Sequence, residues 1–116
     1  MADRELLYFA AKAAGLKTGD WLPGSFGLML YEGITGEKTK RRWNPLTDDG
    51  DALRLAVSLR IEIEPWIHGD SDCARAAVGE ILIDVQHAGA DPCRATRHAI
   101  VRASAEIGRL LVLHNK

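Results

Sequence analysis

The spacing of apolar residues predicts a helix at each end of the chain. From residue 3 to residue 14 apolar positions recur at helical intervals, and Gly15 follows as a natural C-terminal cap. Near the other end, Asp91 is a good N-cap and Pro92 suits the first helical position, where its missing N–H costs nothing. The apolar stripe of this second helix consists of Thr96, Ile100, Ala103, Ile107, Leu110 and Leu111. We expect helices over residues 3–14 and 92–113.

A third helix is predicted over residues 49–59. The acidic residues Asp48, Asp49 and Asp51 stand where the first turn would begin, and their charge complements the exposed N–H groups and the positive dipole end of a helix. The residues that follow are apolar on most sides of a helix. A helix of this kind is expected to be largely buried.

Strands are predicted between these helices. Residues 28–31 form a short continuous apolar run, and in residues 61–66 the apolar positions alternate with Glu62 and Glu64 until Pro65 ends the strand or places it at a sheet edge. Residues 78–85 form a further strand, because β-branched side chains favour a strand over a helix. The glycine-rich segment 15–27 is expected to be a loop, and His68 begins a turn that ends at residue 72.

The order helix, strand, helix, strand, strand, helix indicates an α+β fold: a three- to four-stranded, mainly antiparallel sheet with about three helices. The 116 residues suffice for one domain, residues 1–116. A hydrophobic fraction of 47% excludes a disordered chain, and a charged fraction of 27% excludes an integral membrane protein. The net charge of -1 gives no overall field that would attract nucleic acid or a membrane.

The chain starts without the basic and apolar regions of a secretory signal. We therefore expect a cytoplasmic protein, and in the cytoplasm Cys73 and Cys93 would be reduced.

The densest polar motif runs from residue 43 to residue 54. Its three carboxylates could bind a divalent cation or act as general acid and base, but their spacing does not fit a calcium loop. The interpretation we favour is structural: Asp48 or Asp49 caps the middle helix, Asn44 forms the turn before it, and Trp43 anchors the core. The alternative is a ligand pocket or small active site around Trp43, Asp48, Asp49 and Arg94.

A second polar group lies on the last helix. Arg94, His98, Arg102 and Arg109 fall within an arc of about 80° at the helical period, and Arg97 lies to one side. This face could meet phosphate groups, although a salt-bridged or solvated face, with Arg102 and Glu106 as an i, i+4 pair, is the favoured interpretation.

The only basic run of the chain consists of Lys38, Lys40, Arg41 and Arg42. It is predicted to form a basic sheet edge. Together with the arginines of the last helix and with Trp43 as a stacking residue, it gives the alternative function of a nucleic-acid-associated module.

Residues of the types that bind zinc are present, but their spacing is not that of a zinc site. These residues are His68, Cys73, His87, Cys93 and His98. The sequence also lacks the phosphate-binding, nucleophile-elbow and zinc-protease motifs. We predict no catalytic residue, metal or cofactor.

Two segments, residues 43–56 and residues 95–108, resemble the phage ABA-sandwich domain family. The first segment has the family's tryptophan, its asparagine-proline pair and its acidic helix start. The second segment has the family's arginine-rich, alanine-spaced last helix. These small phage and prophage proteins are distantly similar to the NinX-type accessory proteins of lambdoid phages. The resemblance implies an α/β/α layered fold and a phage or prophage origin, and it carries no catalytic residue.

From the resemblance and the lack of cofactor motifs we expect a non-enzymatic accessory protein. It would bind a host or phage protein in the bacterial cytoplasm, with nucleic acid as the alternative partner and no membrane. A homodimer is also expected to be feasible, because a small sheet often leaves an edge uncovered. If the two motifs meet, Asp48, Asp49 or Asp51 would pair with Arg94, Arg97 or Arg102 and fasten the fold.

Overall fold

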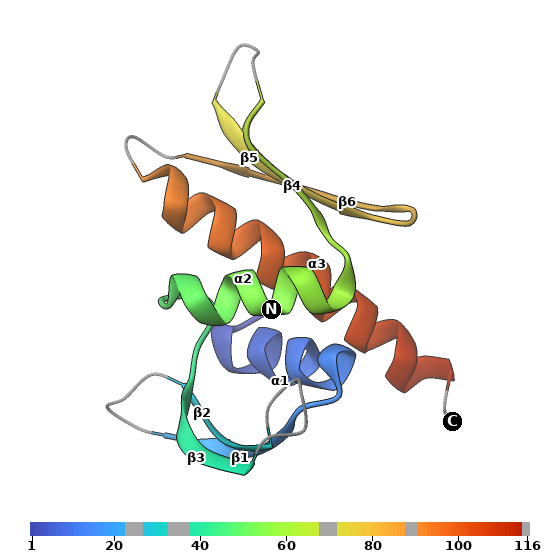
Figure 1. The fold of residues 1–116 in the computed structure, drawn as a ribbon. Helices are drawn as coiled ribbons and strands as arrows, with labels where there is room; N and C mark the ends of the chain where they lie inside the picture. Colours follow the sequence, from blue (N-terminus) through green and yellow to red (C-terminus); the bar gives the residue numbers. More distant parts are fainter. Residues whose placement is uncertain (23–26, 33–37, 68–71, 88–90, 115–116) are drawn as a thin grey trace.

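The computed structural model describes residues 1–22, 27–32, 38–67, 72–87 and 91–114, which contain three helices and six strands (Figure 1). The helices are α1 (Asp3–Ala14), α2 (Asp49–Leu59) and α3 (Pro92–His114). The strands are β1 (Lys17–Trp21), β2 (Leu28–Glu32), β3 (Lys38–Trp43), β4 (Glu62–Ile67), β5 (Cys73–Val78) and β6 (Ile81–Gln86). The predicted turn that starts at His68 lies largely outside the described residues.

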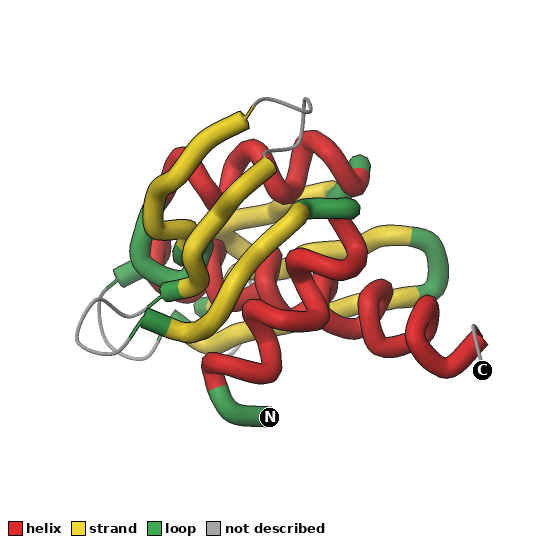
Figure 2. The backbone as a smooth tube through the Cα atoms, turned by 90° about the horizontal axis from the view of Figure 1, so that it is seen from below, coloured by secondary structure: helices red, strands yellow, loops and turns green. Residues whose placement is uncertain are grey.

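The strands form two antiparallel sheets, in the orders β1-β2-β3 and β4-β5-β6. Figures 1 and 2 show the three helices between these sheets. The prediction of an α+β fold with antiparallel pairing and about three helices is therefore confirmed. The strands are divided between two sheets, and the layers run sheet, helices, sheet, whereas the resemblance implied α/β/α. An antiparallel sheet can leave one face exposed to water, so each sheet needs helices on its other face only. The three helices between the sheets cover that face of both sheets.

The helices begin and end where local chemistry predicts. Gly15 closes α1 with φ of 69°, a left-handed conformation that glycine adopts without strain. The carboxylate of Asp48 accepts a hydrogen bond from the Asp51 amide at 2.7 Å and caps α2. The carboxylate of Asp91 accepts one from the Arg94 amide at 3.0 Å at the start of α3. The expected bounds of all three helices hold to within a residue.

Helix α3 is the central element, because it packs against α1, α2 and all three strands of the second sheet. Its buried residues are mostly small: Ala95, Ala99, Ile100, Val101, Ala103, Ser104, Ala105 and Gly108. A Cβ on Gly108 would clash with the carbonyl group of Phe9, so α1 and α3 touch backbone to backbone here. The expected apolar stripe is wrong at its end, where Leu110 and Leu111 are exposed, because the last turns of α3 extend beyond α1 and the sheet (Figure 1).

Two strands were missed in the sequence. Strand β1 lies in the segment expected to be a loop, and it forms because Thr18 and Trp21 pair with Leu30 and Leu28 of β2. Strand β5 has a composition that also suits a helix, but its buried Ala74 and Ala76 let the sheet approach α3 closely.

The expectation that α2 is largely buried is only half correct. Its inner face belongs to the core cluster through Ala52, Leu55 and Ala56, whereas Leu53 and Val57 on its outer face are 59% and 69% exposed.

Candidate functional site

The motif that begins at Trp43 mainly builds the fold. Trp43 is buried in the core, and the carbonyl oxygen of Asn44 accepts a hydrogen bond from the Asp48 amide at 2.9 Å. The Asn44 side-chain oxygen accepts another, from the Leu46 amide at 2.9 Å. This turn leads into α2 as predicted. Because Trp43 and Asn44 are buried, they do not line an open ligand site.

Asp51 is the buried centre of the motif, with 2% of its surface exposed. One carboxylate oxygen accepts hydrogen bonds from Arg41 at 3.0 Å and Arg54 at 2.8 Å, and the other accepts the Asn44 amide at 3.0 Å. This carboxylate ties β3, the turn and α2 together. Asp51 therefore acts within the fold, as Asp48 does through its cap.

Asp49 joins the motif to α3. Its carboxylate pairs with the Arg97 guanidinium at 2.7 Å, and the Nε of Arg97 donates to the Leu46 carbonyl oxygen at 2.8 Å. The expected pairing between the acidic motif and the arginines of the last helix is confirmed for this pair. The Arg97 side chain is mostly buried, whereas Asp49 is exposed.

The remaining basic face of α3 is spread out. Arg94 and Arg102 are exposed, and burial lowers the pKa of His98 between them, with Arg102 acting in the same direction and Asp3 of α1 opposing it. The expected pairing of Glu106 with Arg102 is wrong, because Glu106 binds Arg109. Arg109 reaches Glu106 one helical turn back and neutralises it.

The basic run is divided between the two faces of the edge strand β3. Arg41 points to the helices, where it binds Asp51. Lys38 pairs with Glu32 at 2.7 Å, and Lys17 approaches the same carboxylate at 3.5 Å. The register places Arg42 opposite Met29 on the outer face, and Lys40 and Tyr31 are exposed. The basic sheet edge is confirmed, but its four cations do not form one surface, and the buried Trp43 is not available for stacking.

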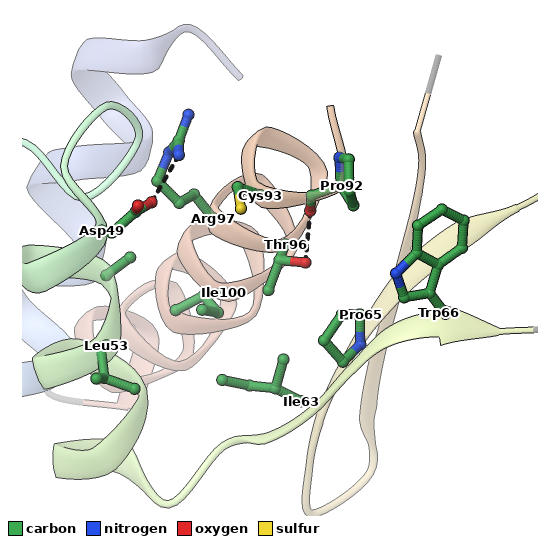
Figure 3. A pocket seen from close by; sticks show the side chains of 11 residues that line it. Asp49, Leu53, Ile63, Pro65, Trp66, Pro92, Cys93, Thr96, Arg97 and Ile100 are labelled. Atoms are coloured by element: carbon green, nitrogen blue, oxygen red, sulfur yellow. Dashed lines mark hydrogen bonds and ion pairs between the residues drawn. The ribbon is translucent and has the colours of Figure 1, made fainter. Parts of the chain in front are cut away.

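A cleft that the sequence did not predict lies between α2, β4 and the first turns of α3 (Figure 3). Its volume is about 310 Å³. Leu53 borders it on α2, Trp66 borders it on β4, and Ile100 lies between them on α3. The lining residues are Asp49, Ala52, Leu53, Ile63, Pro65, Trp66, Pro92, Cys93, Thr96, Arg97 and Ile100.

The cleft has apolar walls and one charged end, formed by Asp49 and Arg97. Thr96 keeps its hydroxyl occupied by donating to the Pro92 carbonyl oxygen at 2.7 Å. Trp66 is 49% exposed, and its ring packs edge to face against His87 with centroids 4.3 Å apart. Large apolar residues at the mouth of a concave site are typical of ligand and peptide binding.

Asp49 and Arg97 are thus the predicted site residues that the cleft brings together. The sequence did contain a signal that Trp66 is exposed. In a strand, Trp66 falls on the same face as the polar residues Glu62 and Glu64, because the three are spaced by two residues. The other walls were missed because they come from three separate elements.

In the described part of the chain, no three His, Cys, Asp or Glu side chains are grouped to hold a metal ion. No helix there is long and apolar enough to cross a membrane. Comparisons with family models, curated proteins and solved structures found no match to this chain. The phage ABA-sandwich assignment therefore stays a prediction.

Proposed function

We propose that this chain is a small, non-enzymatic accessory protein that binds another protein through the cleft between α2, β4 and α3. The observation that carries the proposal is the apolar lining of this cleft, with Leu53 and Trp66 half exposed at its mouth. A volume of about 310 Å³ fits one large apolar side chain of a partner and its neighbouring atoms. The phage or prophage setting belongs to the proposal and rests on the family resemblance.

The charges at one end of the cleft define the partner more closely. Arg97 is already held by Asp49 and the Leu46 carbonyl oxygen, whereas the carboxylates of Asp49 and Asp48 are exposed. A partner segment with an apolar anchor in the cleft and a lysine or arginine next to it would meet these carboxylates. Electrostatic complementarity of this kind adds specificity and a faster association rate more than affinity.

The test is a selection of displayed random peptides against the purified protein. The cleft-filling variant Thr96→Trp and the truncation Trp66→Ala serve as probes. Leu82→Glu is the matched control, because Leu82 is an exposed leucine on β6 that does not line the cleft.

The expected peptides carry an aromatic or aliphatic anchor next to a basic residue. They should bind both probe variants at least about tenfold more weakly than the unmodified protein and the control, which corresponds to about 1.4 kcal/mol. Thermal melting of each variant shows that it is folded. Selected peptides that bind Thr96→Trp as tightly as the unmodified protein would overturn the proposal.

A further inference from the structure

The outer face of α2 is self-complementary, and we infer that it joins two copies of this chain. Six of the eleven residues of α2 are apolar, but the core covers only one side of the helix. Leu53 and Val57, one turn apart, remain 59% and 69% exposed. A helix that is apolar on most sides is normally covered all round.

The charges on this face favour a second copy as the cover. Asp49, Leu53 and Val57 fall within an arc of about 80° at 100° per residue, and Arg60, the C-cap with φ of 56°, follows directly after the last turn. The stripe is acidic at its first end, apolar in the middle and basic at its last end. Arg60 makes no ion pair within the described residues, whereas Asp49 is paired with Arg97 at 2.7 Å in its own chain and, being 75% exposed, has room to accept a second cation.

One two-fold axis satisfies both kinds of contact. Suppose that two α2 helices pack antiparallel, with the two-fold axis at the level of Leu55 along the helix. Leu53 of one copy then lies against Val57 of the other. Measured along the helix, the midpoint between Asp49 and Arg60 lies about half a residue from this axis. At a rise of 1.5 Å per residue the offset is less than 1 Å. The acidic end of each helix then meets the basic end of its partner, as an isologous interface requires.

Arg54, a described cation near the axis, does not oppose this arrangement. Arg54 of one chain would lie near Arg54 of the other. In each chain, however, the Arg54 guanidinium is held by Asp51 at 2.8 Å and lies 4.0 Å from Asp48. Its charge is therefore balanced within each chain.

A helix pair that extends for about 16 Å buries less than the roughly 1,200 Å² of a standard interface, so we expect a weak dimer. Its expected Kd is about 10 to 100 μM. Leu53 also borders the cleft, so the α2 of the second copy would stand at the cleft mouth. The inference does not depend on the proposed function.

Sedimentation velocity from about 5 to about 500 μM protein tests the dimer across its expected range. The unmodified chain should pass from monomer to dimer, and Val57→Glu should raise Kd at least tenfold. Arg60→Glu should also raise Kd, because it sets a carboxylate against Asp49 of the other copy. Leu82→Glu, the same kind of change at an exposed leucine of β6, should leave Kd unchanged.

Oxidative cross-linking tests the register in chains that carry Cys73→Ser and Cys93→Ser. A mixture of Leu53→Cys and Val57→Cys chains should give a mixed dimer. Val57→Cys alone should not, because its two copies are offset by about 6 Å along the helices, beyond disulfide reach.

A chain that stays monomeric over the whole range, or a dimer that persists in Val57→Glu, overturns the inference. Val57 does not line the cleft, and Thr96 on α3 is not part of the α2 stripe, although both surfaces include Asp49 and Leu53. Val57→Glu therefore tests the dimer at a residue outside the cleft, and Thr96→Trp tests peptide binding at a residue outside the stripe, so the two losses can be told apart.

Discussion

Replacing Asp51 by alanine should be among the most destabilising single changes in the acidic motif. The buried Asn44 amide would lose its acceptor, and an unpaired buried N–H costs about 1 to 3 kcal/mol. Arg41 and Arg54 are half exposed and can be rehydrated, so each lost pair adds at most about 1 kcal/mol. The removed desolvation of the carboxylate offsets part of this loss. The expected decrease in the free energy of unfolding is about 3 kcal/mol.

For a domain of this size, about 3 kcal/mol corresponds to a fall in Tm of about 12 °C. Asp49→Ala is the comparison: this carboxylate stands two residues away but is exposed, and its mostly buried partner Arg97 keeps the Leu46 carbonyl oxygen as an acceptor, so its loss should cost about 1 to 2 kcal/mol. Urea unfolding followed by circular dichroism measures both variants. If Asp51→Ala unfolds within about 1 kcal/mol of the unmodified chain, the carboxylate does not hold β3 and α2 together, and a binding role for it would have to be considered.

Three further predictions follow from the packing and the charges. Gly108→Ala should lower stability by about 2 kcal/mol, because its Cβ clashes with the Phe9 carbonyl even though alanine favours a helix; an unchanged urea midpoint would mean that α1 and α3 are not in backbone contact. Because burial and Arg102 lower the pKa of His98 below 6.5, the neutral ring is the form that suits the fold, so stability should be full above pH 6.5 and decrease as the pH falls below it. That decrease should be smaller in His98→Gln than in the unmodified protein. Equal decreases in the two proteins would show that His98 does not cause the pH dependence. Within the described residues, Arg41 and Lys38 of the basic run are held by Asp51 and Glu32, so any binding of single-stranded DNA should show a log–log salt slope no steeper than about −1.4, the slope for two cations, and a slope near −3 would require the whole basic run.

The helices could be predicted from the sequence because their signals are local. Asp48, Asp91 and Gly15 act on amides and carbonyls within a few residues, and these contacts fix where each helix begins or ends. The strand β2 was found in the same way, from a continuous apolar run.

The other features depend on contacts between distant segments. Strand β1 has no alternation and exists because β2 pairs with it, and Ala74 and Ala76 suit a strand only once α3 lies against them. The division into two sheets follows from such packing. The cleft likewise requires α2, β4 and α3 to converge, so only its charged end, Asp49 with Arg97, could be anticipated from residue types.

The position of α3 in the chain has a consequence for how the protein is made. Both sheets are meanders of neighbouring strands and can pair while the chain is being synthesised. The helix against which the second sheet, α1 and α2 all pack follows all of these elements in the chain. Until residues 92–114 leave the ribosome, α1, α2 and the second sheet lack the helix that packs against all three. The nascent chain is therefore expected to be a transient client of chaperones until α3 has emerged, and its cooperative folding begins only after that.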